Sequence, residues 1–195
     1  GGWDLVLVGG LVNKMNYIRA SVPGIKKPED LKGKRVGITQ IGSSSYHAVM
    51  LALKHWGMDA RRDKVTMLQV GNQAGRVASL QTGGSDAVIV NPGLATTLRE
   101  RGFNVLADFT ELPIPYPQQV LAARERAIKS DPDLFERILK SIAAGTAFTW
   151  DPRNKERVKA ILARYLRLES VAKAEEHYLS ALKVLPKKPY VELVG

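Results

Sequence analysis

Hydrophobic and polar positions in the first half of the chain predict strands that alternate with helices. Short valine-rich apolar runs predict strands at 5–8, 35–39, 65–70, 87–90 and 105–108. Apolar residues at helical spacing predict helices at 43–56, 73–81 and 93–101. Strands separated by helices of this length are typical of βαβ units, so the pattern predicts an α/β fold with a mostly parallel sheet.

The pattern changes after residue 108. Prolines at 113, 115 and 117 exclude a regular helix there and predict an extended segment. From residue 122 onward the pattern predicts mostly helix, with starts at Ser130-Asp131-Pro132 and at Asp151-Pro152. We therefore expect a strand and a first crossing segment at 1–21, an α/β lobe at 22–108, and a second crossing segment with a helical return at 109–195. Two crossing segments between lobes form a natural hinge.

The segment IGSSSY, residues 41–46, lies between a predicted strand and a predicted helix. Backbone N–H groups in the first turn of a helix have no partner within it, and the helix dipole adds positive charge there. Gly42 lets a ligand approach the backbone, and the hydroxyls of Ser43, Ser44 and Ser45 add donors that can turn toward an oxyanion. The segment therefore predicts a site for an anion or polar group, and the alternative is one capping serine with exposed neighbours.

Two further strand ends carry small or amide residues. Gly71 and Asn72 follow the strand predicted at 65–70, and Asn91 and Pro92 follow the strand predicted at 87–90. Ligands bind at the carboxyl ends of strands in open parallel sheets, so these positions are expected to line one edge of a cleft. Taken singly, each pair is also an ordinary turn dipeptide.

Composition narrows the classes of function. The absence of cysteine excludes disulfide scaffolds and thiolate metal sites. The net charge is +10, but the basic residues are dispersed, aromatic residues do not interleave with them, and no nucleic-acid-binding motif is present. We therefore expect no nucleic-acid partner, no cofactor and no metal, and a basic protein that attracts a small anion. No apolar run is long enough to span a bilayer.

An enzymatic alternative rests on His47, which lies four residues after Ser43 and could share a helix face with it. A Ser–His pair is the beginning of a nucleophilic site. However, no G-x-S-x-G turn is present and no acid is obviously placed to orient the histidine. We expect a binding protein and not an enzyme.

The stretch IKKPEDLKGKRVGITQIGSSSYHAV resembles the lobe-entry segment of periplasmic solute-binding proteins of ABC importers. It is most similar to the NMT1/SsuA-like group, which serves nitrate, taurine, aliphatic sulfonates and thiamine precursors. LQVGNQAGRVASLQTGGSDAVIVNP resembles the next segment of that group, and LADFTELPIPYP resembles the crossing back to the first lobe. The resemblance extends from about residue 5 to residue 190.

The resemblance implies a type II periplasmic-binding-protein-like fold, with two α/β lobes joined by two crossing strands and a small polar or anionic organic ligand held between the lobes. The ligand would be a sulfonate, a carboxylate, a nitrate-like ion or a pyrimidine, delivered to an importer permease. By position, the implied ligand-binding residues are Gly42, Ser43, Ser44, Ser45, Tyr46, Asn72 and Asn91, with Asn13 and Tyr116 near the crossing strands.

Relatives in that group begin with a further α/β segment of the first lobe, and this chain begins where that segment would end. The resemblance therefore implies an incomplete first lobe, a fragment or processed product without a signal peptide, and an apolar face that would favour dimerisation. It implies a periplasmic or extracellular membrane-associated location. The same fold serves cytoplasmic enzymes and the ligand-sensing domains of LysR-type regulators, which remain the alternative functions.

Overall fold

The computed structural model describes residues 4–190, and contacts between Cα atoms divide the chain into two compact units. The central unit is Asn16–Ile114. The terminal unit combines the residues up to Met15 with those from Pro115 onward. The chain thus passes from one unit to the other twice, after residue 15 and after residue 114.

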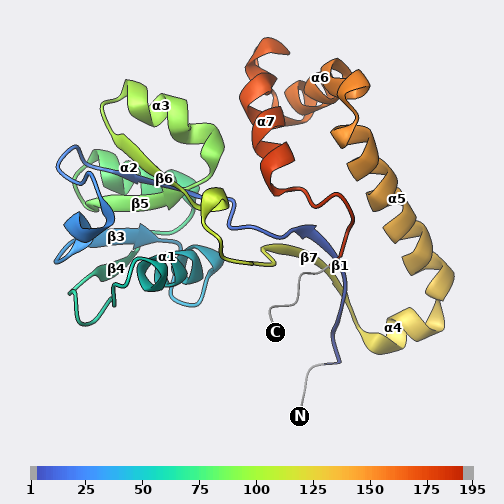
Figure 1. Ribbon diagram of the computed structural model, residues 1–195, viewed down its shortest axis with the longest axis horizontal. Helices are drawn as coiled ribbons and strands as arrows, with labels where there is room; N and C mark the ends of the chain where they lie inside the picture. The colour runs from blue at the N-terminus through green and yellow to red at the C-terminus, as the bar shows by residue number, and fades with distance from the viewer. Residues whose placement is uncertain (1–3, 191–195) are drawn as a thin grey trace. The chain divides into compact units, whose positions relative to one another are not determined.

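The central unit is built on a five-stranded sheet (Figure 1). β3 is parallel to both of its neighbours, β4 and β5, whereas β2 is antiparallel to β5 and β6. The observed bounds of β3, β4, β5 and β6 agree with the strands predicted from the sequence to within one residue at each end. Across the sheet the order is β4 (Thr66–Gln69), β3 (Arg35–Ile38), β5 (Ala87–Val90), β2 (Ile18–Ser21) and β6 (Asn104–Asp108).

Helices follow the parallel strands, as the sequence predicted. The α-helices are α1 (Ser44–His55), α2 (Gln73–Gln81) and α3 (Ala95–Glu100). Short 3-10 turns are η1 (Pro28–Leu31), η2 (Pro92–Leu94) and η3 (Phe109–Glu111).

The helices cover both faces of this sheet (Figure 1). On one face, Leu80 of α2 and Leu98 of α3 pack in a buried cluster with Ile18, Ala20 and other strand residues. Side chains alternate along a strand, so Arg19 points to the opposite face. There its guanidinium lies 5.2 Å from the ring centroid of Trp56, directly after α1. Each strand of the sheet centre is therefore buried on both sides, which explains the fully buried AVIV sequence of β5.

The described residues of the terminal unit, 4–15 and 115–190, form a two-stranded antiparallel sheet and four α-helices. β1 (Val6–Val12) pairs with β7 (Gln119–Ala123). The helices are α4 (Glu125–Ser130), α5 (Pro132–Trp150), α6 (Lys155–Leu166) and α7 (Glu175–Val184), with short turns η4 (Pro152–Asn154) and η5 (Ala172–Ala174). The side chain of Glu175, in α7, forms ion pairs with Lys155 at 2.7 Å and with Lys159 at 3.0 Å, both in α6. These pairs join the two helices.

Two strands were not predicted. β2 contains a buried arginine, and β7 follows the proline-rich segment, so neither has the valine-rich pattern of the other strands. The pairing of β2 with β5 and β6 places residues 18–21 in the central unit, whereas the sequence suggested that the lobe begins at 22. The predicted cap of the long helix is confirmed: Asp131 accepts a hydrogen bond from Leu134 N at 3.0 Å.

Candidate functional site

Three loops meet at one edge of the central sheet. β3, β4 and β5 run in the same direction, so their carboxyl ends lie together. Hydrogen bonds join the loops that follow: Gly71 N donates to Thr39 O at 3.3 Å, and Asn91 N donates to Gln73 Oε1 at 2.9 Å. β2 is antiparallel, so its amino end, preceded by Tyr17, lies at this same edge. The predicted edge is therefore assembled from segments far apart in the sequence.

The start of α1 is formed by Gly42 and Ser43. Gly42 has φ +83°, a left-handed conformation that favours glycine, and nothing lies within 4 Å of where a Cβ would be. Ser43 is the N-cap, because its Oγ accepts a hydrogen bond from Tyr46 N at 3.3 Å. The same hydroxyl donates to Gln40 O at 2.7 Å. This serine is thus used to build the turn.

Ser44 is the serine most open to a ligand. Its side chain is exposed, and its Oγ lies 2.8 Å from the Tyr17 hydroxyl, either of which can donate. Tyr17 is itself 7% exposed, so its ring is fixed while its hydroxyl reaches the helix start. The pair places two adjustable hydroxyl groups beside the free N–H groups of the first helical turn.

Ser45 is buried, at 1% exposure. Its Oγ accepts the Thr39 N–H at 2.9 Å, donates to Thr39 Oγ1 at 3.2 Å and lies 3.0 Å from Ser43 Oγ. These bonds tie the first turn of α1 to the end of β3. The three serines, which the sequence presented as equivalent donors, therefore occupy three different environments.

The other predicted positions of the central unit are also at helix starts. Asn72 caps α2 by accepting a hydrogen bond from Gly75 N at 3.0 Å. Asn91 precedes η2 without a side-chain cap. Tyr46 is half-buried, and its ring meets that of exposed His47 edge-on with centroids 5.4 Å apart. Within residues 4–190, no side-chain hydrogen bond joins this histidine to a serine or an acid.

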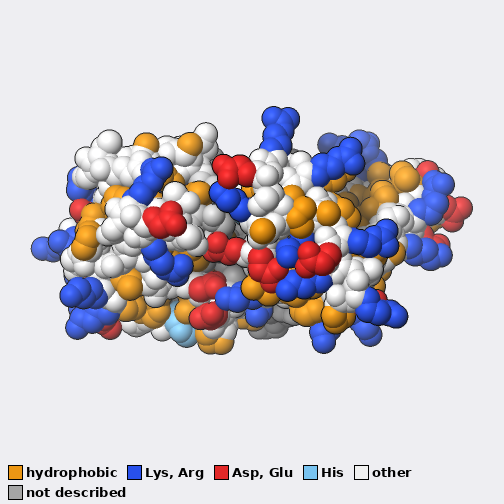
Figure 2. Space-filling model, turned by 90° about the horizontal axis from the view of Figure 1, so that it is seen from above, with side chains coloured by type: hydrophobic (Ala, Val, Ile, Leu, Met, Phe, Trp, Pro, Cys, Tyr) orange, Lys and Arg blue, Asp and Glu red, His pale blue; other side chains and the backbone are white. Residues whose placement is uncertain are grey.

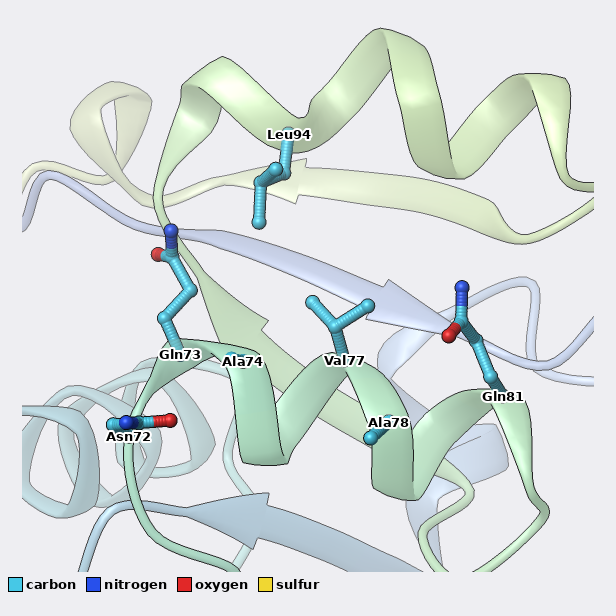
Figure 3. A pocket seen from close by; sticks show the side chains of 7 residues that line it. All are labelled: Asn72, Gln73, Ala74, Val77, Ala78, Gln81 and Leu94. Atoms are coloured by element: carbon cyan, nitrogen blue, oxygen red, sulfur yellow. The ribbon is translucent and has the colours of Figure 1, made fainter. Parts of the chain in front are cut away.

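A shallow pocket of about 590 Å³ lies between α2 and η2. Figure 3 shows Leu94 pointing toward Val77, with the amides of Gln73 and Gln81 on either side. The pocket borders two of the predicted loops, through Asn72 and Leu94, but none of the serines lines it. It is an apolar groove beside the strand edge and not the anion site that the sequence predicted.

Asn13 and Tyr116 belong to the terminal unit. Tyr116 N donates to Asn13 O at 3.2 Å. Asn13 is buried and its Nδ2 donates to Tyr190 O at 2.8 Å, while its Oδ1 is enclosed and has no hydrogen-bond partner among residues 4–190. The two residues are thus adjacent in the structure, and the amide of Asn13 holds the segment that follows α7.

The positive charge of the chain is mostly dispersed or paired. Lys and Arg side chains are interspersed with acidic and hydrophobic ones over the face seen in Figure 2. In the central unit Arg35 pairs with Asp86 at 3.0 Å, and Arg62 pairs with Asp63 at 2.8 Å. Across the described chain, no cluster of three His, Asp or Glu side chains could hold a metal ion.

Arg76 was not predicted from the sequence as a residue of this edge. This α2 residue is 5% exposed, and its guanidinium lies among the ends of three strands. Nε donates to Ile89 O at 2.5 Å, and Nη1 donates to Gly71 O at 3.3 Å and to Thr39 Oγ1. The signal was present in the sequence, because position 76 is four residues before the buried Leu80 and so shares its inward face.

A family model described as NMT1/THI5 like matches residues 2–155. Over 84 residues the chain is 34% identical to a taurine-binding periplasmic protein of Escherichia coli (strain K12), covering 43% of this chain and 25% of that protein. The chain therefore spans about a quarter of this curated relative.

Solved structures show the same fold. The periplasmic aliphatic sulphonate binding protein SsuA of Escherichia coli superposes with a TM-score of 0.71 at 26% identity, over 95% of this chain and 61% of that one. The alkanesulfonate-binding protein SsuA of Xanthomonas axonopodis pv. citri, bound to MOPS, superposes with a TM-score of 0.73 at 19% identity, over 94% and 61%. The predicted α/β, periplasmic-binding-protein-like fold is confirmed. Because the family match covers most of the residues, the chain belongs to the NMT1/THI5-like family.

Proposed function

We propose that this chain is part of the solute-binding component of an ABC-type importer and captures a small polar or anionic organic ligand. The observation that carries the proposal is the open start of α1, where Gly42 and Ser44 lie beside the hydroxyl of Tyr17 at the carboxyl edge of the sheet. The relatives support it, since they are named as binding proteins for taurine, aliphatic sulfonates or, in Synechocystis, nitrate.

The proposed roles of the predicted residues differ. Ser44 and the N–H groups of the first α1 turn bind the polar head of the ligand, while Gly42 keeps their approach open. Ser43 and Ser45 position that turn, because their hydroxyls are bonded within the protein. For Tyr46, Asn72 and Asn91, contact with the ligand at the carboxyl edge of the sheet remains a prediction. Asn13 and Tyr116 stay predictions that rest on the resemblance.

The proposed mechanism is binding without covalent chemistry. Backbone N–H groups and hydroxyls stabilise a negative or polar head, and none of them is activated by a neighbouring base. An enzymatic role would need His47 to act as a base, and within residues 4–190 no side-chain hydrogen bond joins this histidine to a serine or an acid. The named relatives are periplasmic binding proteins.

A permease partner and a periplasmic location follow from the same proposal, through the periplasmic relatives. No helix among the described residues is both long and apolar enough to cross a membrane. Dimerisation finds no support in the comparisons and is not part of the proposal.

The test is a thermal-shift and calorimetric screen of the chain with taurine, ethanesulfonate, nitrate, propionate and a neutral aminopyrimidine. A ligand present at one hundred times its Kd adds about 2.7 kcal/mol of stability. We expect one of these ligands to raise the Tm of the native sequence and to lose at least tenfold in affinity in Ser44→Ala, about 1.4 kcal/mol. A folded chain that binds none of the five, or a Ser44→Ala variant with unchanged affinity, contradicts the proposed site.

A further inference from the structure

Arg76 places a buried positive charge across the carboxyl ends of β3, β4 and β5. Its three bonded partners come from three different segments: Thr39 after β3, Gly71 after β4 and Ile89 within β5. Two of these segments lead directly into the starts of α1 and α2. The guanidinium therefore lies close to two helix N-termini, each of which carries partial positive charge.

No carboxylate compensates this charge among residues 4–190. Salt bridges within 4.0 Å pair several other cations of the described chain, such as Arg35 with Asp86 and Lys159 with Glu175. Burial lowers the pKa of Arg76, and only the hydroxyl of Tyr17 opposes this effect. Arg19 is also buried, but it faces Trp56 on the other side of the sheet and the acids Asp30 and Glu29 act on it.

Part of the guanidinium is still available. Nε and Nη1 are used by the strand ends, whereas Nη2 has no hydrogen-bond partner in the described chain and is not among the fully enclosed side-chain atoms. Thr39 accepts from Arg76 and is bonded to Ser45, so the arginine is joined through one threonine to the first turn of α1. A buried cation without a counterion is costly unless a negative group reaches it.

We propose that Arg76 makes this site selective for a ligand with a compact anionic head group, of the sulfonate, nitrate or carboxylate class, and against neutral ligands of the same shape. This inference rests on the proposed function and narrows its ligand class. The anion supplies the missing negative charge, the α1 N–H groups and Ser44 bind its oxygens, and Arg76 determines the preference for charge.

The test compares ethanesulfonate with ethanesulfonamide, which has nearly the same shape but no charge at pH 7. Both are titrated into the ¹⁵N-labelled chain, and the backbone N–H signals of residues 43–46 report local binding. Nitrate, propionate and inorganic phosphate are titrated in the same way to distinguish the head groups. Arg76→Gln and Arg76→Lys are compared with Arg99→Gln, which removes the same charge from an exposed position of the central unit.

The native chain is expected to bind ethanesulfonate at least tenfold more tightly than ethanesulfonamide. In Arg76→Gln we expect ethanesulfonate to weaken at least tenfold and ethanesulfonamide by less than threefold, so that the preference disappears. Arg76→Lys should retain part of the preference, and Arg99→Gln should change either affinity by less than twofold. If Arg76→Gln fails to fold, the lysine variant still reports on the geometry of the charge.

Three results would overturn the inference, and they are distinguishable. If ethanesulfonamide or an aminopyrimidine binds at residues 43–46 as well as ethanesulfonate does, the binding site stands and the role of Arg76 is wrong. An Arg76→Lys variant that folds and keeps the full native preference for ethanesulfonate would also show that the guanidinium group does not determine this preference. If no ligand shifts these signals, the proposed function fails together with the inference.

Discussion

Ser45 and Thr39 are joined by two hydrogen bonds in the connection between β3 and α1. Ser45 Oγ accepts the backbone N–H of Thr39 at 2.9 Å and donates to Thr39 Oγ1 at 3.2 Å. The serine is buried and Thr39 is half-buried, so both bonds are partly shielded from water. The loop that presents Gly42 and Ser44 is therefore held from its inner side, which keeps the first turn of α1 in place without a ligand.

The three serines should differ in their effects on stability. Ser45→Ala leaves the N–H of half-buried Thr39 without its partner, and we expect a loss of about 1–3 kcal/mol in the free energy of unfolding. Ser43→Ala removes the N-cap and should cost about 1 kcal/mol. Ser44→Ala should change stability by less than about 0.5 kcal/mol, because its side chain is exposed. Urea unfolding of the three variants checks this order, and equal losses for Ser44 and Ser45 would contradict it.

Tyr17 should affect binding through Ser44. The two hydroxyls lie 2.8 Å apart, so Tyr17→Phe leaves the Ser44 hydroxyl free to rotate. We expect a threefold to tenfold loss of affinity for the best ligand of the screen. A double-mutant cycle with Ser44→Ala measures whether the two hydroxyls act together, and additive losses would show that they act separately.

Asp86 should make stability depend on pH. Hydrogen bonds from the Arg35 side chain, and then from its backbone N–H, hold the pKa of Asp86 below its usual value against the opposing effect of burial. A lowered pKa in the folded state gives stability that is present above the ordinary pKa of about 3.9 and is lost as the pH falls below it.

Asp86→Asn removes this contribution. We expect it to cost about 1 kcal/mol at pH 7, a modest value because both partners are partly exposed to solvent. The difference from the native chain should shrink as the pH falls from about 5 to about 2. Unfolding measured at several pH values checks this, and a difference that stays constant would exclude the Arg35 pair as its source. Ligand affinity should not change, since Arg35 begins β3 and Asp86 directly precedes β5, whereas the proposed site lies at the carboxyl ends of these strands.

Two glycines should respond oppositely to the same substitution. A Cβ at Gly75, in the first turn of α2, would collide with the carbonyl oxygen of Val70, so Gly75→Ala should cost about 1–3 kcal/mol. A Cβ at Gly145, inside α5, would meet nothing within 4 Å, so Gly145→Ala should stabilise the protein by about 0.5–1 kcal/mol. Thermal unfolding of both variants tests the close packing of α2 on the end of β4.

The sequence by itself determined most of the regular elements of the central unit and predicted where the proposed site lies. Valine-rich runs and helical spacing identified four strands and the helices of the central unit, because these segments are buried in the usual α/β manner. Glycine and serine directly after a strand indicated the start of α1, because a helix start depends on the local sequence.

Tertiary structure alone decided which of these residues are free to bind. Ser43, Ser44 and Ser45 are identical in type, and only their neighbours Gln40, Tyr17 and Thr39 distinguish them. β2 is a strand because β5 and β6 pair with it on both sides, which its short sequence does not reveal. The position of Arg76 across three strand ends likewise depends on long-range pairing, since residues 39, 71 and 89 meet only when the parallel sheet forms.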